Sequence, residues 1–208
     1  HKGEIVGISG LAGSGQTELL NILFEAGRYT GIEKKGVLLN SSVSYVSGDR
    51  AREGIFHLWD IFDNIIIGNL DQVKKGWFLN KKKSEELAQS WYDKMKFRAE
   101  GLNSPIMSLS GGNQQKAIIA RELDRDPEIG IAVQPVRGLD VGAIEYIHKQ
   151  LVEQRNEGKA VLLVSLELDE VMDISDRIIV MYEGEIVADV NPKEITVEEL
   201  GLYMAGAK

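Results

Sequence analysis

The chain has 208 residues, a length that suits one domain with room for a subdomain. Its formal net charge of −8 argues against a nucleic-acid-binding surface, which would need a basic face. The chain has no cysteine, which excludes disulfides and cysteine-ligated metals, and no apolar run approaches the ~18 residues that cross a bilayer.

Apolar runs and helical patterns alternate along the chain and indicate an α/β core. Helical spacing of apolar residues marks 17–27, 81–97 and 142–158. Strand-like runs occupy 4–10, 43–47, 129–134, 160–165, 177–182 and 185–190. Because such runs alternating with helices are typical of a buried parallel sheet, we expect a mostly parallel sheet. A capping box at Thr196 and Glu199 predicts a further helix near the C-terminus.

The stretch "SGLAGSGQTELL" places a glycine-rich loop between the first strand and the first helix. Gly10, Gly13 and Gly15 are spaced as in the phosphate-binding loop G-x-x-x-x-G-K-[ST], and Thr17 stands where that loop serves a metal. The lysine position holds Gln16. The spacing and the strand–loop–helix context therefore predict a phosphate loop that lacks its cation.

A second glycine motif lies in "MSLSGGNQQKAIIARELD" (107–124), where Ser110-Gly111-Gly112 precedes a helix. Such a helix start offers free N–H groups and a positive dipole end to an anion. On its own, "LSGG" could be an ordinary helix cap. Here it follows the glycine loop and precedes an apolar strand with a Pro-x-Arg-Gly-x-Asp turn, and this order favours a functional motif.

The ordered set resembles the ATP-binding cassette (ABC) ATPase domain of membrane transporters. "LSGGNQQK" (109–116) is similar to the family's signature motif, "RGLDVGA" (137–143) to its D-loop region, and "DRIIVMYEGEIV" (176–187) to its closing strands. The resemblance covers essentially the whole chain. It is greatest to the C-terminal cassette of tandem ATPases that drive importers of ribose-like sugars or nucleosides.

The resemblance implies an α/β P-loop NTPase core over 1–208, with a helical subdomain inserted at about 54–115, and a chain that is a piece of a tandem protein. It implies ATP and Mg²⁺ as cofactors, a second cassette and transmembrane permease subunits as partners, and a peripheral place on the cytoplasmic face of the membrane. In the family, each ATP lies between one cassette's phosphate loop and the other's signature. The nucleotide-contacting positions that carry over are Gly10, Gly13, Ser14, Gly15, Gln16, Thr17, Glu18, Ser110, Gly111, Gly112, Asn113, Gln114 and Asp140.

The phosphate-loop side departs from the family pattern at several positions. Gln16 replaces the phosphate-binding lysine, and a lost charge-assisted contact costs about 1.5–3 kcal/mol. Val133 stands where an Asp would help Thr17 to hold Mg²⁺, and valine offers no oxygen ligand. Gln134 replaces the Glu that accepts the attacking water's proton, and loss of a general base commonly costs about 10²–10⁴ in rate.

Two further departures concern residues that face the γ-phosphate in the family. Leu166 stands where a His is often found, and Gly48 where many cassettes have a Gln. The signature itself is intact. We therefore expect a degenerate nucleotide site in this cassette, with a signature that completes a working site on a partner cassette. Whether the chain is itself an ATPase is left open by these replacements.

Two rival interpretations remain at this point. One is a soluble ABC protein of translation or DNA repair, against which the acidic balance and the lack of an inserted basic or coiled-coil arm count. The other is a non-catalytic interaction module that kept the fold and lost nucleotide binding, against which the intact signature counts.

Other polar and aromatic residues have less specific interpretations. Asp49 and Arg50 fit a solvated loop as well as a nucleotide or membrane-subunit edge. His57 and His148 are interpreted as structural. A solvated surface is favoured over a lipid or partner contact for lysines 74, 75, 81, 82 and 83. The tryptophans, at 59, 77 and 91, are assigned to subdomain packing, with docking on a membrane subunit as the alternative for one of them.

Overall fold

The computed structural model describes residues 1–29, 31–33 and 35–207, which form two compact units. The first unit comprises 1–45, 127–135 and 148–208, and the second comprises 46–126 and 136–147. The stretch 54–115, expected as an inserted helical subdomain, falls entirely within the wider second unit.

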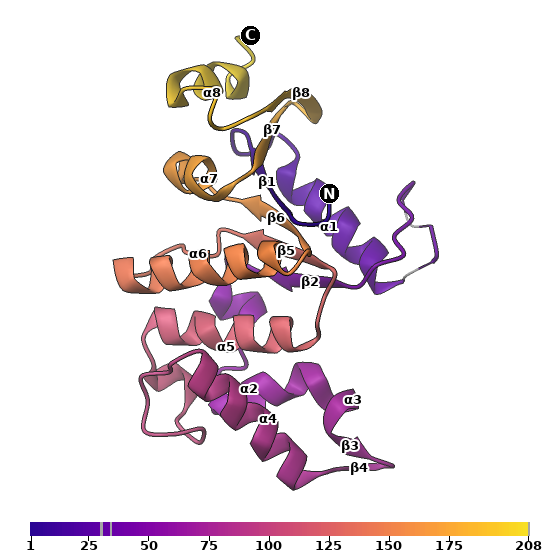
Figure 1. The fold of residues 1–208 in the computed structure, drawn as a ribbon, viewed down its shortest axis with the longest axis vertical. Coiled ribbons are helices and arrows are strands. Elements are labelled where there is room, and N and C mark those ends of the chain that lie inside the picture. Colours follow the sequence, from indigo (N-terminus) through magenta and orange to yellow (C-terminus); the bar gives the residue numbers. More distant parts are fainter. Residues whose placement is uncertain (30, 34, 208) are drawn as a thin grey trace. The chain divides into compact units, whose positions relative to one another are not determined.

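The first unit is built on a mostly parallel sheet (Figure 1). The strands are β1 (Glu4–Ser9), β2 (Val43–Val46), β5 (Ile129–Val133), β6 (Ala160–Val164), β7 (Arg177–Tyr182) and β8 (Glu185–Val190). Their order is β2-β5-β6-β1-β7-β8. Parallel pairs join β5 to β6, β6 to β1 and β1 to β7, whereas β8 runs antiparallel to β7. The expected mostly parallel sheet is confirmed, and 185–190 is its antiparallel edge.

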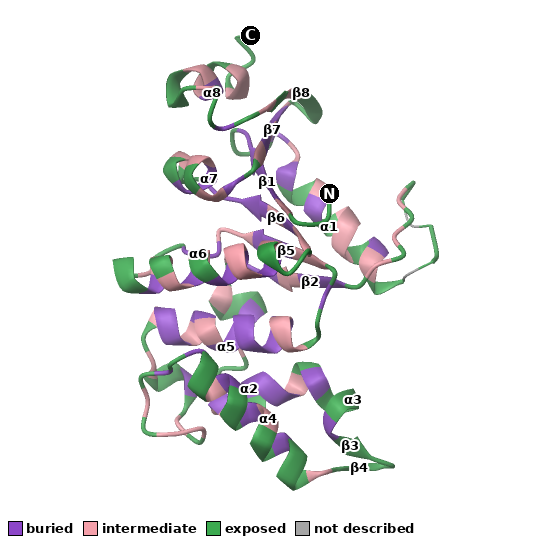
Figure 2. Cartoon of the chain, viewed as in Figure 1, coloured by how far each residue is buried: buried purple, intermediate pink, exposed green. Residues whose placement is uncertain are grey.

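The helices of the first unit cover this sheet. They are α1 (Gln16–Arg28), α7 (Leu168–Ile174), α8 (Val197–Met204) and the part of α6 (Val141–Asn156) that starts at His148. Buried residues, purple in Figure 2, concentrate in β1, β2, β5, β6 and β7, whereas the edge strand β8 has none. The predicted capping box is confirmed, because Thr196 accepts from the backbone of Glu199 and the Glu199 carboxylate accepts in return.

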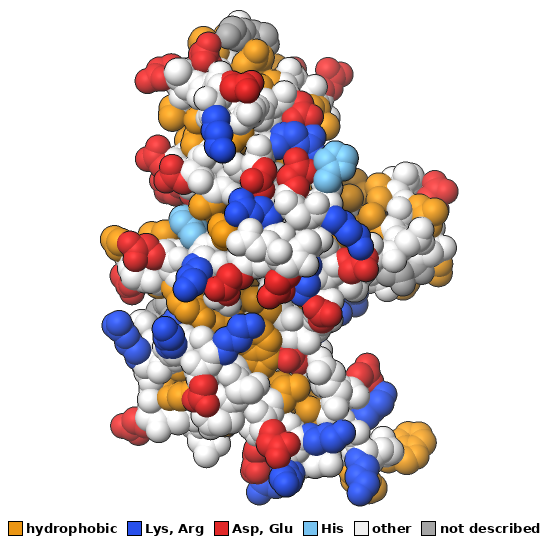
Figure 3. Space-filling view, viewed as in Figure 1, with side chains coloured by type: hydrophobic (Ala, Val, Ile, Leu, Met, Phe, Trp, Pro, Cys, Tyr) orange, Lys and Arg blue, Asp and Glu red, His pale blue; other side chains and the backbone are white. Residues whose placement is uncertain are grey.

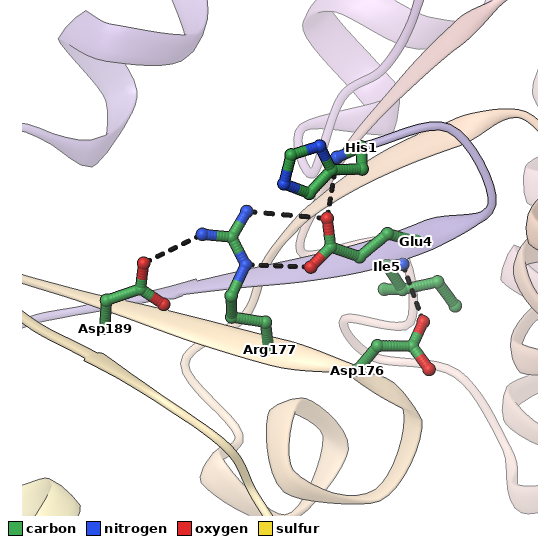
Figure 4. Close-up of polar contacts among 6 residues, drawn as sticks. All are labelled: His1, Glu4, Ile5, Asp176, Arg177 and Asp189. Atoms are coloured by element: carbon green, nitrogen blue, oxygen red, sulfur yellow. Dashed lines mark hydrogen bonds and ion pairs between the residues drawn. The ribbon is translucent and has the colours of Figure 1, made fainter.

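An ion-pair cluster joins the strand starts of β1, β7 and the end of β8 (Figure 4). Arg177 Nε donates to Glu4 Oε1 at 2.8 Å, and Arg177 Nη1 donates to Asp189 Oδ2 at 2.8 Å. The Glu4 side chain is only 16% exposed. The hydrogen bond from Arg177 holds the pKa of Glu4 below its usual range, against the opposing effect of burial. Beside it, the Ile5 amide donates to Asp176 Oδ2 at 2.8 Å.

The second unit is mainly helical. It holds a π-helical turn at Arg50–Gly54, 3₁₀ turns at Ile67–Asn69 and Ile106–Ser108, and the start of α6. Its other elements are α2 (Ile61–Ile66), α3 (Leu70–Val73), β3 (Lys74–Lys75), β4 (Phe78–Leu79), α4 (Lys81–Lys94) and α5 (Gly111–Asp124). A core that includes Ile61, Met95 and Ile118 holds these helices together.

Two local features of the second unit differ from expectation. The helix expected over 81–97 ends at Lys94, and Lys96 has a left-handed φ of 50°, which no helix continues. The β3–β4 hairpin was not predicted, because strands of two residues give no alternation to detect.

Candidate functional site

The glycine loop joins β1 to α1 in the first unit. Gly15 has a φ of 100°, a left-handed conformation that glycine adopts without strain, and α1 begins at the next residue. The loop is closed by the Ser14 amide, which donates to Leu11 O at 3.1 Å, and is held from β7–β8 by the Gly184 amide, which donates to Ser14 O at 3.1 Å. The backbone thus has the form of a phosphate loop at a helix N-terminus.

The side chain of Gln16 turns back into this loop. Gln16 is 8% exposed, and its Nε2 donates to Leu11 O at 3.2 Å. A Cβ at Gly10 would lie 2.4 Å from this Nε2 and 2.5 Å from Met181 O, so position 10 has no room for a side chain. The amide braces the loop from within, where a lysine would project a cation.

The loop fits phosphate groups better than it fits a divalent ion. Free N–H groups at the start of α1 suit an anion, with Ser14 buried and Thr17 and Glu18 exposed beside them. In the described part of the chain, no three acidic or histidine side chains gather as a metal site. Val133 contributes no oxygen, so Thr17 is the one oxygen ligand that the predicted metal position retains.

Three other positions that depart from the family pattern, Val133, Gln134 and Leu166, lie at the same sheet edge as the loop. β5 ends at Val133, which pairs with Val164 at the end of β6, and β6 lies beside β1. Gln134 follows with a φ of 44° and donates its backbone N–H to Val164 O at 2.6 Å. Leu166 is 63% exposed just beyond β6. The carboxyl ends of three neighbouring parallel strands therefore collect these positions, as is usual for sites in open α/β sheets.

The signature residues begin α5 in the second unit. Ser110 caps the helix, because its Oγ accepts from Asn113 N at 3.5 Å and from Asn113 Nδ2 at 3.1 Å. Asn113 Oδ1 in turn accepts from the Arg98 amide at 3.1 Å, and Gln114 Nε2 donates to Leu109 O at 3.2 Å. These bonds fix the side chains around the helix start.

Two glycines let other elements approach that helix start closely. A Cβ at Gly112 would lie 2.8 Å from Ala143 Cβ, so the first turn of α6 packs directly on α5 there. Asp140 caps that turn, with Oδ1 accepting from the Ala143 amide at 2.9 Å. A Cβ at Gly111 would lie 3.0 Å from an Arg50 guanidinium nitrogen.

Arg50, for which the sequence left a solvated loop and a functional edge equally open, lies beside the start of α5. Its Nη1 donates to Arg137 O at 2.7 Å, which ties the π-helical turn to the loop before Asp140. Burial, and then the nearby Arg137 charge, lowers the pKa of Arg50. Asp49 caps the turn by accepting from the Arg52 amide at 3.2 Å, and Gly48 lies just before it.

The histidines and tryptophans weighed from the sequence lie in different surroundings. His148 Nε2 lies 2.9 Å from Glu170 Oε1, whereas His57 is exposed. Trp91 is buried in the core and Trp59 stacks on Phe56. The assignment of Trp77 to packing is wrong, because its side chain is 99% exposed.

Residues 1–136 match the family described as "ABC transporter", and the chain belongs to that family. Among curated relatives, the chain is 43% identical to the guanosine import ATP-binding protein NupO of Bacillus subtilis (strain 168), an alignment that covers 99% of the chain and 43% of NupO. It is 35% identical to the ribose import ATP-binding protein RbsA of Roseobacter denitrificans, over 99% of the chain and 42% of RbsA. The chain thus spans less than half the length of these relatives.

Solved structures show the same fold. A dimeric ATP-binding cassette in a post-hydrolysis state, bound to ADP and Pi, has a TM-score of 0.73 at 23% identity, over 92% of this chain and 87% of that one. A metal-chelate-type ABC transporter in an inward-facing conformation has a TM-score of 0.77 at 18% identity, over 99% and 79%. The expected ABC ATPase fold is therefore confirmed. Among the described helices, none combines the length and apolarity that spanning a bilayer requires.

Proposed function

We propose that this chain is the nucleotide-binding, energy-coupling cassette of an ABC importer for simple sugars or nucleosides. Family membership supports this role, and so do the names of the relatives, which are import ATP-binding proteins for guanosine and ribose. The higher identity to the guanosine protein, 43% against 35%, favours a nucleoside as the transported substrate. Permease subunits and a peripheral position at the cytoplasmic face of the membrane belong to the same proposal.

The cassette's own phosphate loop is proposed to be degenerate. The observation that carries this is the inward turn of Gln16, whose amide nitrogen donates to Leu11 O within the loop. The backbone N–H groups still hold phosphates, without the charge-assisted contact of a lysine. Gln134 orients water but is too weak a base to accept its proton. We infer weak nucleotide binding with negligible turnover.

The signature is proposed to serve a partner cassette, of which the N-terminal half of a longer tandem protein is the leading candidate. The support is local: Ser110, Asn113 and Gln114 are fixed by hydrogen bonds around the start of α5, and the cap residue Ser110 is exposed. Such a start presents N–H groups and a positive dipole end to the terminal phosphate of a partner's nucleotide. At that shared site ATP would supply the phosphoanhydride bond that is hydrolysed, and Mg²⁺ would neutralise part of the phosphate charge.

Nucleotide titration and steady-state turnover on this chain alone test the degenerate loop. Calorimetry with ATP and Mg²⁺ should show binding weaker by roughly ten- to a hundredfold than at a loop with lysine. No sustained release of phosphate is expected. Robust steady-state hydrolysis would contradict the degenerate site, and a complete lack of nucleotide binding, alone and with a partner cassette, would favour the non-catalytic interaction module.

A further inference from the structure

The hairpin of the second unit carries its largest apolar side chains at its tip. β3 and β4 pair antiparallel with Lys75 opposite Phe78, which leaves Gly76 and Trp77 as a two-residue turn. Gly76 has a φ of 63°, the left-handed conformation that such a turn needs at its first position. The turn therefore places Trp77 at the end of the hairpin, with Phe78 directly after it.

These side chains are exposed to a degree that is unusual for their size. Trp77 is 99% exposed, Phe78 80% and Leu79 54%. None of the apolar clusters found among the described residues includes them. Grouped apolar side chains that remain in water commonly mark a surface that binds a partner or a membrane.

Lysines surround this apolar tip. Residues 70–83 contain five lysines and a single aspartate, in a chain whose net charge is −8. Figure 3 shows hydrophobic and basic side chains together at the end of the hairpin. Lys81 and Lys82 lie 3.7 and 3.8 Å from Glu85 and Glu86, with every one of these side chains more than half exposed. Such exposed pairs are weak and leave the ammonium groups available.

We propose that this surface, the hairpin patch, binds the surface of an anionic phospholipid bilayer. The hairpin patch comprises Lys74, Lys75, Trp77, Phe78, Leu79, Lys81, Lys82 and Lys83. Indole and phenyl rings partition to the boundary between headgroups and acyl chains. Lysine ammonium groups on long apolar stems reach the lipid phosphates around that point. Nucleic acid is a poorer fit, because the apolar rings form the tip and the rest of the chain is acidic.

Vesicle co-sedimentation of the full chain tests this proposal. Vesicles of phosphatidylcholine with phosphatidylglycerol should retain the chain, and vesicles of phosphatidylcholine alone should retain much less. Trp77→Ala with Phe78→Ala should lower the partition coefficient at least about tenfold, since both rings then lose their burial in lipid. Replacing Lys81, Lys82 and Lys83 by Gln should lower it about fivefold for each lysine, and added salt should reduce the difference.

Two matched controls distinguish binding through the hairpin patch from non-specific binding of exposed apolar or basic side chains to vesicles. Leu58→Ala removes another apolar side chain of the same unit, which is 98% exposed. Replacing Lys2, Lys149 and Lys193 by Gln makes the same change of charge at exposed positions elsewhere in the sequence. Both variants should bind the anionic vesicles as the parent chain does. Circular dichroism should show all variants folded, because the changed side chains lie outside the core.

Several results would overturn the proposal. Equal retention of the parent chain and the Trp77→Ala/Phe78→Ala variant would show that the aromatic rings do not contact the lipid. Equal retention by both vesicle compositions would show that the anionic headgroup is not recognised. Retention only by vesicles that contain permease subunits would assign the patch to a protein partner. The vesicle assay contains no nucleotide, so its outcome is independent of the proposed nucleotide-binding function.

Discussion

The glycine loop of the first unit and the start of α5 in the second unit both present backbone N–H groups at a helix N-terminus, but their side chains differ in role. In the loop, Gln16 turns inward and donates to Leu11 O. At α5, Ser110 and the buried Asn113 form a capping network in which Ser110 itself is exposed. The loop has the backbone form of a phosphate loop with a neutral amide at the lysine position, whereas the start of α5 combines its backbone form with the side chains of the family's signature.

The difference shows that the backbone form of a phosphate loop does not depend on the side chains of its chemistry. The path of the loop depends on two glycines: Gly10 has no room for a Cβ, and Gly15 has a left-handed φ. It also depends on the backbone hydrogen bonds of Ser14. None of these needs a lysine. Cation, metal ligand and base are separate side chains, so each can be replaced without unfolding the loop. Glycine spacing alone is therefore weak evidence of catalysis.

The largest expected effect comes from blocking the intact region. Ser110→Arg in a chain paired with its partner cassette should abolish the pair's ATP hydrolysis, because a long side chain would fill the space in front of the α5 N-terminus. Ser108→Arg is the matched control: Ser108 is exposed, lies two residues earlier and is outside α5. Phosphate release by both pairs would be measured. Persistent activity in the Ser110 variant would show that the signature does not serve that site.

Restoring the family's residues at the glycine loop should give the next largest effect, if the loop is degenerate as proposed. The combined change Gln16→Lys, Val133→Asp and Gln134→Glu returns the cation, a metal ligand and the base. We expect turnover to rise by about 10²–10⁴, mostly from the base. In the chain alone the rate should rise with the square of its concentration, because two copies must pair loop to signature. Gln16→Lys with Val133→Asp, which retains Gln134, is the control and should improve binding without turnover.

A rebuilt loop that stays inactive at high concentration would contradict this account. It would mean that the first unit has lost more than three side chains, for example through the left-handed backbone at Gln134. A non-glycine residue in that conformation is uncommon and costs of order 1–3 kcal/mol. Its position between β5 and the loop that leads to Asp140 makes it the first place to look for such a loss.

The sequence predicted the positions of the strands and of the glycine loop better than the orientation of the side chains in the loop. The strands are matched to within a residue or two, because hydrophobic runs between glycines record buried strands directly. The glycine loop between β1 and α1 was predicted from the glycine spacing and its place between a strand and a helix. The inward turn of Gln16 was not, since it depends on the space above Gly10 and on the carbonyl of Leu11, which only the folded loop brings together.

Two other features had signals too weak or too ambiguous in the sequence. For the lysines around "GWFL" the sequence favoured a solvated surface over a lipid or partner contact, and only the folded hairpin shows Trp77 in water beside them. Arg50 reaches Arg137 O, which lies 87 positions away in the chain. Contacts at such separations are set by packing of the helices, and no local pattern encodes them.

The smallest expected effect concerns stability, and it tests whether the two regions can be perturbed separately. Arg177→Gln removes the donor to Glu4 and Asp189 at the edge of the sheet opposite the glycine loop. We expect a loss of about 1–3 kcal/mol of unfolding free energy, mostly from the poorly exposed Glu4. Asp189→Asn, which breaks only the exposed half of the cluster, is the control and should cost within about 0.5 kcal/mol.

The pH dependence of that loss follows from the direction of the Glu4 shift. Arg177 lowers the pKa of Glu4 in the folded chain from an ordinary value of 4.5, so the pair stabilises the fold fully above that value. The contribution disappears as the pH falls through the lowered pKa. Denaturant unfolding of the parent chain and of Arg177→Gln should therefore differ most near neutral pH and converge in acid. Hydrogen exchange should show the loss in β1 and β7 while the amides of α5 keep their protection. Equal loss in α5 would mean that the two units unfold as one, and that the glycine loop and the signature helix share a single stability.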